Sequence, residues 1–466
     1  MSWPQQIADY QGGALAMACL LMLVSFIVNR LYGRRGRERY KRGARVVTGP
    51  LFATRLLRRP GSHLTLAGIA IPALDETKHF KLIGTTGTGK STAIRELLAG
   101  AIRRGDRAVI ADPDGGYLAH FYDRHRGDVI LNPFEPHSVK WDWYAEIHNS
   151  YDVEQLASGL IPSSSDASGQ EWRGYARTFL TAVARRCHQS GWRDPAELWR
   201  LLAVASCDEL RPVVAGTPAQ PFLDPDNSRM FGSIRAVAGS AMAALEYIQS
   251  QRAAGFSVRQ WVRTLTHPGV LFIPYKAGQI AALRSMIANW MRLAIFESMS
   301  QQENSDQRLW FVIDELDALG AIEGLKDALA RLRKFGGRCI LGFQSLAQVS
   351  STYGAGDAQT IVENCGNSLI LRCSGSENGG TSHFASRLIG EREIVRRQLS
   401  HGRDREGPFA ARGSRRSTSA SDQHVVEMAV MPSELEMLPD LSGYLKKASS
   451  PAWLKISMNR RTGVHS

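Results

Sequence analysis

The sequence has few cysteines and no recognisable set of metal ligands. The cysteines are Cys19, Cys187, Cys207, Cys339, Cys365 and Cys373. They form no CxxC pair, and several stand in apolar runs, where a thiol behaves as a small core residue. The histidines lack metal-ligand spacing, and there is no evident Ser-His-Asp or Cys-His arrangement. We therefore expect reduced thiols, no zinc site and a cytoplasmic location for the bulk of the chain.

Charged residues are absent between Tyr10 and Asn29, a stretch of about 20 residues that can cross a bilayer as one helix. Residues 1–9 contain no Lys or Arg, so the basic start of a cleaved signal peptide is missing. Basic residues follow the stretch: Arg30, Arg34, Arg35, Arg37, Arg39, Lys41, Arg42 and Arg45. Lys and Arg concentrate on the cytoplasmic side of membrane helices. The pattern predicts an uncleaved single-pass anchor with everything after Arg30 in the cytoplasm.

Acidic residues are outnumbered by basic ones, 44 against 57, which gives a formal net charge of +13. This excess favours a polyanionic partner, either nucleic acid or an anionic lipid surface, although a merely basic enzyme is the alternative. The 44% hydrophobic content is ordinary for a protein with a large core. A length of 466 residues allows about three domains. The hydrophobic content argues against a chain that is mainly disordered.

Beyond the basic linker, short apolar runs alternate with helical patterns. The runs are FKLIG (80–84), RAVIAD (107–112), DVILNP (128–133), GVLFIPY (269–275), LWFVIDE (309–315), RCILGF (338–343) and NSLILRC (367–373). Almost continuous apolar strands separated by helices are typical of a parallel sheet that is covered on both faces. The sequence therefore predicts an α/β fold with a mainly parallel sheet.

More than a hundred residues between the third and fourth runs carry no strand pattern. Apolar residues there recur at helical spacing: Trp172, Tyr175, Ala176, Phe179, Leu180 and Val183. Asp194 is a predicted N-cap before Pro195, with Glu197 placed to complete a capping box. We expect an all-helical insert over residues 149–262. Near the C-terminus, residues 401–423 are expected to form a long hairpin loop, either solvated or in contact with nucleic acid.

A phosphate-binding loop stands at the end of the first apolar run and before a helical pattern. Its residues are Gly84, Thr85, Thr86, Gly87, Thr88, Gly89, Lys90, Ser91 and Thr92. Glycines let the backbone amides curl around phosphates, and the start of the helix adds a positive dipole end. We expect Lys90 to reach the β- and γ-phosphates of a nucleotide and Ser91 to coordinate Mg²⁺.

Acidic and polar residues follow two further runs. Asp314 is expected to hold Mg²⁺, directly or through water, and Glu315 to polarise the attacking water as general base. Gln344 ends the next strand and can sense the γ-phosphate, although it can also be a solvent-facing side chain. Exposed cations in RLRK, Arg333 among them, either enter the site of a neighbouring subunit or are a solvated helix face. The segment DPDGGY (112–117) is a simple turn or part of the site.

With these motifs in place, the chain resembles the type IV secretion coupling proteins, the TraD/TrwB-like ATPases of bacterial conjugation in the TraG/TraD family. The resemblance rests on LIGTTGTGKS, RAVIADPDGGYL, ILNPFE, WFVIDELDALG, ARLRKFGGRCILGFQS and VVEMAVMPSELEMLPDLSGYL, in that order. It extends from about residue 78 to the C-terminus and includes the helical insert, so it is more specific than the phosphate-binding loop alone.

The resemblance implies a RecA-like domain with an all-α domain facing the cytoplasm, assembled as a homohexamer around a channel at the bacterial inner membrane. It implies hydrolysis of ATP with Mg²⁺, stimulated by DNA, and binding of DNA with little sequence preference. The partners would be a relaxase-DNA complex and the proteins of a type IV secretion channel. Matched by position, Lys90, Asp314, Glu315 and Gln344 take the nucleotide roles, and Arg333 looks like the arginine finger.

The implied domains are an anchor (1–30), a basic linker (31–60), a nucleotide-binding domain in two parts (61–148 and 263–466) and the all-α domain (149–262). One departure is that the family usually has two transmembrane helices, whereas one is visible here. Other hypotheses are an FtsK-like DNA translocase, a protein-substrate ATPase, and a nucleotide-gated docking adaptor of the secretion machine. The first normally adds a winged-helix module, for which we see no room after Leu454; Glu315 argues against the adaptor.

Overall fold

The computed structural model describes residues 38–48, 64–163, 167–264, 269–304, 306–376, 379–404 and 415–458. The chain divides into two compact units, one of residues 1–46 and 386–431 and one of residues 47–385 and 432–466. The predicted membrane-spanning stretch lies outside the described residues. Within the described ranges, no helix combines the length and the apolar character that crossing a bilayer requires.

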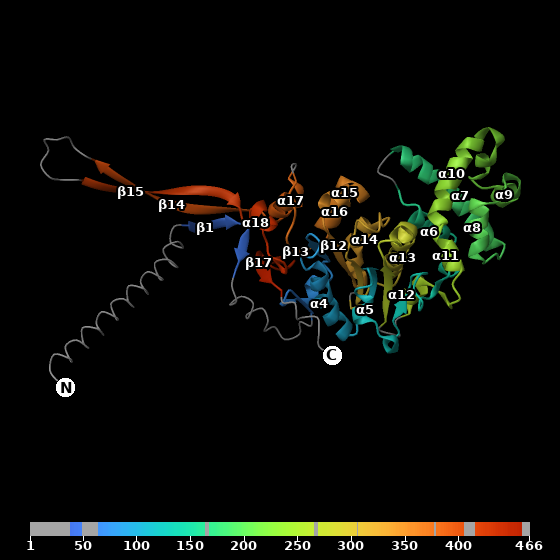
Figure 1. Cartoon of the computed structure of the whole chain (residues 1–466), viewed down its shortest axis with the longest axis horizontal. Helices are drawn as coiled ribbons and strands as arrows, with labels where there is room; N and C mark the ends of the chain where they lie inside the picture. The colour runs from blue at the N-terminus through green and yellow to red at the C-terminus, as the bar shows by residue number, and fades with distance from the viewer. Residues whose placement is uncertain are drawn as a thin grey trace. The chain divides into compact units, whose positions relative to one another are not determined.

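The first unit is a three-stranded antiparallel sheet in the order β1-β14-β15 (Figure 1). Its strands are β1 (Glu38–Gly43), β14 (Glu391–Asp404) and β15 (Arg415–Met428). The ladder between β14 and β15 begins at Glu391 opposite Met428 and continues to Asp404 opposite Arg415. The predicted hairpin is therefore confirmed, but its loop was predicted too long, because strand pairing extends well into residues 401–423. Pairing uses backbone groups and does not require the apolar alternation that was absent there.

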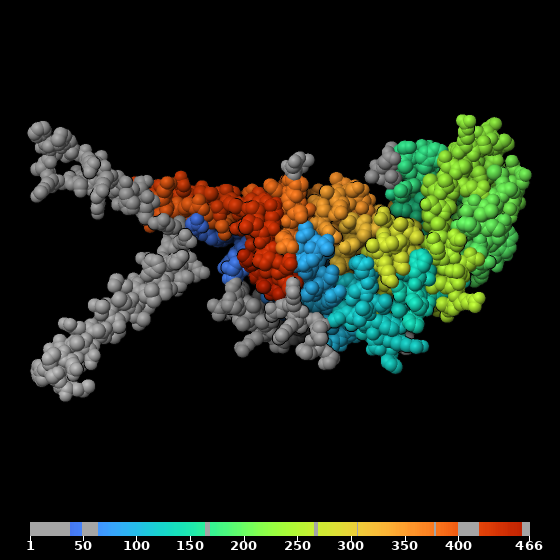
Figure 2. Space-filling model, in the orientation of Figure 1, coloured from blue at the N-terminus to red at the C-terminus, as the bar shows by residue number. Residues whose placement is uncertain are grey.

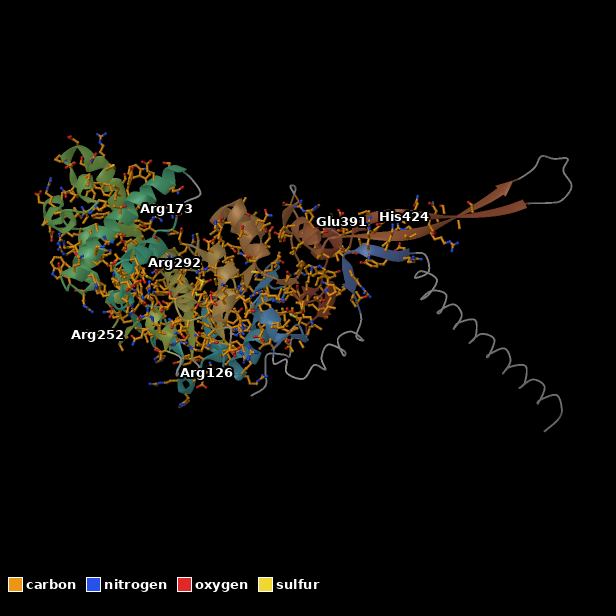
Figure 3. The ribbon with its side chains drawn as sticks, turned by 180° about the vertical axis from the view of Figure 1, so that it is seen from behind. Arg126, Arg173, Arg252, Arg292, Glu391 and His424 are labelled. Carbon is orange, nitrogen blue, oxygen red and sulfur yellow. The ribbon has the colours of Figure 1, made fainter. Side chains whose placement is uncertain are left out.

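A carboxylate holds the three strands of this unit together. Glu393 accepts hydrogen bonds from Lys41 (2.8 Å) and Arg42 (2.5 Å) of β1 and lies 3.0 Å from the ring of His424 on β15. The hydrogen bonds from Lys41, His424 and Arg42 lower the pKa of Glu393 to about 2. His424 is labelled in Figure 3. Two cations of the basic linker thus have a structural role inside the sheet.

The second unit is built on a ten-stranded sheet in the order β2-β17-β16-β13-β5-β12-β11-β6-β10-β7. The seven predicted strands are all present: β5 (Phe80–Ile83), β6 (Arg107–Pro113), β7 (Val129–Ile130), β10 (Val270–Tyr275), β11 (Leu309–Ile313), β12 (Gly337–Phe343) and β13 (Asn367–Ile370). Each pairs in parallel with its neighbours among these seven. The predicted α/β class with a mainly parallel sheet is confirmed.

Antiparallel strands close one side of this sheet. β16 (Ser442–Lys446) pairs with β13 and with β17 (Ala452–Ser457), and β2 (Arg45–Val47) is the edge strand. A separate small hairpin is formed by β3 (Leu64–Leu66) and β4 (Ile69–Ile71). The last part of the chain therefore returns to the side of the sheet where the phosphate-binding loop begins, because β13 is also the neighbour of β5.

Both faces of the central strands are buried. Every residue of β11 is buried although successive side chains point to opposite faces, so neither face is open to solvent. Helix α4 (Lys90–Arg103) packs Ala93, Ile94 and Leu97 into the same cluster as Phe80 and Trp310. Because the strands are parallel, the carboxyl ends of β5, β6, β11 and β12 all reach one edge of the sheet, and the chemistry-bearing residues follow those ends.

Helices fill the range in which the all-helical insert was predicted. They are α6 (Asp152–Leu160), α7 (Ala167–Gln189), α8 (Pro195–Ala203), α9 (Cys207–Val214), α10 (Ser228–Met242), α11 (Ala244–Gln249) and α12 (Val258–Arg263). Figures 1 and 2 show most of them gathered as one lobe, coloured green. The described part of this range also contains one short strand, β9 (Gly255–Phe256), which pairs with β8 (Lys140–Trp141).

The predicted local signals in this range are mostly present. Ala176, Phe179 and Val183 of α7 are fully buried, as the helical stripe predicted. Asp194 caps α8 by accepting a hydrogen bond from the backbone N–H of Ala196 (2.9 Å). The capping box at Glu197 was wrong, because that carboxylate pairs with Arg200 one turn further along the helix.

Buried polar contacts join two helices of this group to neighbouring elements. Glu146 accepts hydrogen bonds from the indole of Trp141 and from the backbone N–H groups of Val258 and Arg259 at 2.7 to 3.1 Å. Arg292 of α13 (Ile280–Met299), labelled in Figure 3, donates to the carbonyl of Gln155 in α6 at 2.9 Å. Burial lowers the pKa of Arg292 to about 10. The contacts of Glu146 hold the start of α12 beside Trp141 of β8, and the contact of Arg292 holds α6 against α13.

Candidate nucleotide-binding site

The predicted phosphate-binding loop connects β5 to α4 at the carboxyl edge of the sheet. Gly87 and Gly89 adopt left-handed φ angles of 78° and 111°. A Cβ atom on Gly89 would also lie 2.6 Å from Cδ2 of Leu441, so the position requires glycine. The hydroxyl of Thr88 donates to the carbonyl of Thr85 (2.7 Å), and the N–H of Thr85 donates to the carbonyl of Arg372 (2.9 Å). The loop is therefore held by its own turn and by the segment that follows β13.

Lys90 is the first residue of α4 and is 7% exposed. Its Nζ lies 3.4 Å from the carbonyl of Gly84, so the side chain curls back over the loop rather than extending away from it. Thr86, near the tip of the loop, donates its hydroxyl to Oε1 of Gln344 at 3.0 Å. The structure thus brings the loop, its lysine and the end of β12 together as the sequence predicted.

Ser91 and Asp314 meet where the first turn of α4 approaches the end of β11. The Ser91 hydroxyl donates to Oδ2 of Asp314 at 2.6 Å. The same oxygen accepts a hydrogen bond from the Tyr117 hydroxyl at 2.8 Å. Oδ1 of Asp314 is buried and has no hydrogen-bond partner within the described part of the chain. The Asp314 carboxylate, with Oδ1 unpartnered, and the Ser91 hydroxyl beside it are oxygen donors of the kind that Mg²⁺ prefers, either directly or through bound water.

Glu315 and Gln344 form a second pair beside the loop. The amide Nε2 of Gln344 donates to Oε1 of Glu315 at 3.3 Å, while the amide oxygen accepts from Thr86. Burial and the adjacent Asp314 carboxylate raise the pKa of Glu315, and Lys90 opposes the shift. Gln344 therefore bridges the tip of the phosphate-binding loop and the predicted general base, and it is not the free solvent-facing side chain of the alternative interpretation.

Arg333 is not part of this group. It lies in the short helix η5 (Leu332–Phe335), which leads into the amino end of β12, whereas Gln344 follows the carboxyl end. Seven residues of β12 separate the two positions, a strand length of about 20 Å. Arg333 is exposed and has no ion-pair partner among the residues described. The fold therefore places it at the sheet edge opposite the phosphate-binding loop of its own chain.

The segment DPDGGY, for which the sequence left open a simple turn or a part of the site, brings the Tyr117 hydroxyl to Asp314. Sequence reasoning assigned a definite role to neither Tyr117 nor Asp112. Asp112 is the penultimate residue of β6, and its carboxylate accepts hydrogen bonds from the N–H groups of Tyr117 (3.0 Å) and Leu118 (2.6 Å). Burial raises the pKa of Asp112 to about 6. The segment DPDGGY drew attention by its position after a strand. Its spacing gave no indication that the tyrosine at its end folds back to the carboxylate of another strand.

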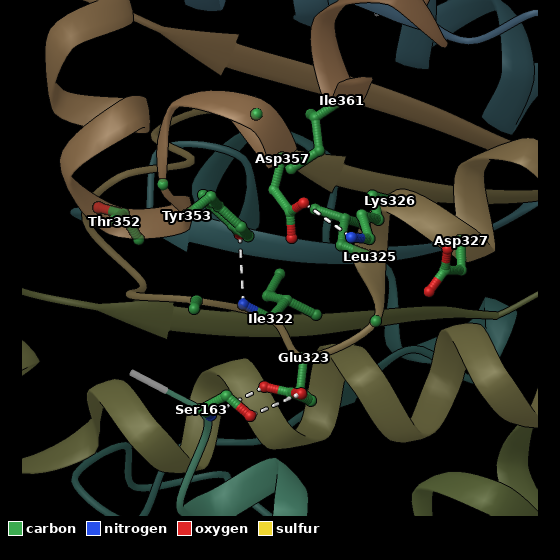
Figure 4. Close-up of a pocket in the computed structure, with 14 residues that line it drawn as sticks. Ser163, Ile322, Glu323, Leu325, Lys326, Asp327, Thr352, Tyr353, Asp357 and Ile361 are labelled. Atoms are coloured by element: carbon green, nitrogen blue, oxygen red, sulfur yellow. Dashed lines mark hydrogen bonds and ion pairs between the residues drawn. The ribbon is translucent and has the colours of Figure 1, made fainter. Parts of the chain in front are cut away.

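A separate cavity of about 520 Å³ lies beside the segment that follows Asp314 and Glu315 (Figure 4). Glu323 accepts two hydrogen bonds from Ser163 (3.0 and 3.2 Å), and Lys326 pairs with Asp357 at 2.7 Å. The close-up shows Ser163 directed at Glu323 and Lys326 directed at Asp357. Most of the polar groups that line it are thus already engaged, and the residues of the phosphate-binding loop do not line it.

Comparisons with known proteins agree with this architecture. The coupling protein TraD of Escherichia coli (strain K12) is 29% identical over 465 residues, which cover 96% of this chain and 63% of TraD. The chain thus spans less than two thirds of that relative. The solved structure of the plasmid coupling protein TrwB with an ATP analogue, ADPNP, matches at 31% identity and a TM-score of 0.79, covering 91% of this chain and 95% of TrwB.

TrwB with ADP and Mg²⁺ matches equally well, at 30% identity and a TM-score of 0.79, over 92% of this chain and 97% of that chain. Residues 63–459 match a family model described as the type IV secretion-system coupling protein DNA-binding domain. The match covers the ten-stranded sheet apart from its edge strand β2, and it includes the helical group and the phosphate-binding loop. The chain belongs to the family of TraD/TrwB-like type IV secretion-system coupling proteins.

Proposed function

We propose that this protein binds ATP with Mg²⁺ and hydrolyses it to drive or gate the passage of DNA during conjugation. The observation that carries the proposal is the group formed by Ser91, Asp314, Glu315 and Gln344 around the phosphate-binding loop, in which one buried oxygen of Asp314 has no partner. A protein that used this loop only for packing would not need a water-activating carboxylate bridged to it.

In this proposal each residue has a definite task. The backbone amides of residues 84–89 and the Lys90 ammonium hold the β- and γ-phosphates. Ser91 and Asp314 hold Mg²⁺, which when bound neutralises phosphate charge. Glu315 accepts the proton of the attacking water, and its raised pKa makes it a stronger base than an ordinary carboxylate. Gln344 contacts both the loop and Glu315, so it can report loss of the γ-phosphate to β12.

The wider role follows from family membership. We propose that the protein couples a relaxase-DNA complex to a type IV secretion channel, with DNA bound mainly through its backbone. The names of the relatives and the net charge of +13 support this role. We also propose a bacterial inner-membrane anchor at residues 1–30, a linker at 31–60, a nucleotide-binding domain at 61–148 and 263–466, and an all-α domain at 149–262.

Arg333 extends the proposal to the assembly. Because it lies at the sheet edge opposite the phosphate-binding loop of its own chain, it can act as an arginine finger only in the site of a neighbour. A homohexamer would supply that neighbour at every site. An arginine finger typically contributes 10³- to 10⁵-fold to turnover, so this arrangement would make hydrolysis depend on assembly.

The test is phosphate release by the purified full-length protein in detergent or lipid nanodiscs, with and without single-stranded DNA. We expect Lys90→Ala to abolish hydrolysis and to spare DNA binding. Lys326 is a lysine paired with Asp357 away from the loop, and we expect Lys326→Ala to retain both hydrolysis and DNA binding. Wild-type turnover should rise strongly with DNA. Substantial hydrolysis by Lys90→Ala would overturn the assigned site, and no stimulation by DNA would favour a docking adaptor.

A mixing experiment tests the finger. Arg333→Ala and Lys90→Ala are each expected to be inactive alone. Mixed together, they should regain part of the wild-type turnover, because some sites then combine an intact Lys90 with an intact Arg333 from the adjacent chain. Absence of any recovery in rings shown to exchange subunits would contradict the role of Arg333 in a neighbouring site.

A further inference from the structure

The hydroxyl of Tyr117 is the feature of the site that no motif predicts. It donates to Oδ2 of Asp314 at 2.8 Å, next to the Ser91 hydroxyl, which reaches the same oxygen at 2.6 Å. Tyr117 is 2% exposed, so this hydrogen bond is shielded from water. Two donors thus converge on Oδ2 of Asp314. The second carboxylate oxygen, Oδ1, is buried and has no hydrogen-bond partner within the described ranges.

The turn before Tyr117 is built to place this side chain. Asp114 and Gly115 adopt left-handed φ angles of 57° and 69°, which reverse the chain immediately after β6. Asp114 donates its N–H to the carbonyl of Tyr275 (2.8 Å), and the Asp112 carboxylate accepts from the N–H of Tyr117. A left-handed φ angle is unusual for a residue other than glycine, so the contacts around Asp114 must hold it in this conformation.

The ring is fixed from the other side by α4. The guanidinium of Arg95 lies 5.7 Å from the centre of the Tyr117 ring. A Cβ atom on Gly116 would come within 2.9 Å of Nη2 of Arg95, so a larger residue there would compete with the guanidinium for space. A tyrosine hydroxyl is protonated at neutral pH, so it can donate this hydrogen bond to Asp314.

The two donors to Asp314 differ in what else they do. The Ser91 hydroxyl is the one expected to turn its oxygen to Mg²⁺, whereas Tyr117 has its hydroxyl committed to the carboxylate. Groups that hydrogen-bond to a metal-binding side chain fix its orientation, and removing them typically weakens metal binding 10- to 100-fold. We propose that Tyr117 is a positioning residue that holds Asp314 by Oδ2 and leaves Oδ1 available to Mg²⁺ or to a water bound to it.

This inference rests on the proposed function and is tested by Mg²⁺ dependence rather than by turnover. Tyr117→Phe removes the hydroxyl and keeps the buried ring. Tyr353→Phe is the matched control, because it removes a hydroxyl bonded to the backbone of Gly320 and Ile322 that has no hydrogen bond to Asp314. The affinity of the full-length protein for a fluorescent N-methylanthraniloyl ATP is measured over a Mg²⁺ titration and in EDTA.

For Tyr117→Phe, we expect the half-saturating Mg²⁺ concentration to rise about 10-fold or more, with unchanged nucleotide affinity in EDTA. Tyr353→Phe should match the wild type in both. An unaltered Mg²⁺ titration for Tyr117→Phe overturns the inference. An equal loss of affinity with and without Mg²⁺ also overturns it, since it would show a purely structural role. Failure of the wild type to bind nucleotide would overturn the proposed function itself, so the two failures are distinguishable.

Discussion

Glu315 is the residue whose replacement tests the chemistry most directly. Glu315→Gln preserves the shape of the side chain, and its amide oxygen can still accept the hydrogen bond from Gln344 that now measures 3.3 Å. The variant cannot accept a proton from water. General base catalysis typically contributes 10²- to 10⁴-fold, so we expect turnover to fall by that factor, equivalent to about 3 to 5 kcal/mol in the barrier. Nucleotide affinity should stay equal or increase, because a negative charge near the phosphates is lost.

The assay is phosphate release at saturating ATP and Mg²⁺, with nucleotide binding measured separately by equilibrium dialysis. Glu323→Gln is the control, because this acid follows in the same segment but binds Ser163 instead of the phosphate-binding loop. Burial raises the pKa of Glu315, so wild-type turnover should fall on the acid side at a pH above that of an ordinary glutamate, and the variant should lack that limb. Retention of more than a tenth of wild-type turnover by Glu315→Gln would refute the assignment of the base.

Three further changes have expected outcomes that the structure sets. Glu146→Gln places an amide N–H among buried donors and should lower the free energy of unfolding by about 2 to 4 kcal/mol in urea titrations. Gly342→Ala puts a Cβ atom 2.3 Å from the Asp314 carbonyl, so we expect a loss of about 1 to 3 kcal/mol and a lower thermal midpoint; an unchanged midpoint contradicts the close approach. Asp112, with its pKa raised to about 6 by burial, is disfavoured as an anion in the folded state. As pH rises from 4 to 7 the wild type should therefore lose up to about 3 kcal/mol relative to Asp112→Asn, and parallel stability curves would argue against that shift.

The central sheet was predictable because its signals are local. Each of the seven strands is a short apolar run, and the loop from Gly84 to Ser91 is specified by glycines that permit its backbone angles. Ser91 and Asp314 were both expected at the carboxyl edge of the sheet, since parallel strands end there, and both were expected to hold Mg²⁺. Their contact also requires β5 and β11 to lie close together, and the strand order β5-β12-β11 provides this.

Other features depend on contacts that the local sequence pattern does not indicate. The extension of β14 and β15 beyond the apolar residues follows from backbone pairing, which the polar composition of residues 401–423 did not indicate. The capping box at Glu197 did not form, because Arg200 on the next turn donates hydrogen bonds to both oxygens of that carboxylate. Each difference arises from a contact that competes with the local pattern.

The sequence by itself determined the class of fold, and it predicted the phosphate-binding loop and the acids expected to serve it. Glycine spacing, apolar runs and strand-terminal carboxylates act over a few residues and survive in any arrangement of the rest. Only the tertiary structure decided that Tyr117 shares Asp314 with Ser91. This relation depends on where a turn redirects the chain after β6, and a one-dimensional pattern does not contain that direction.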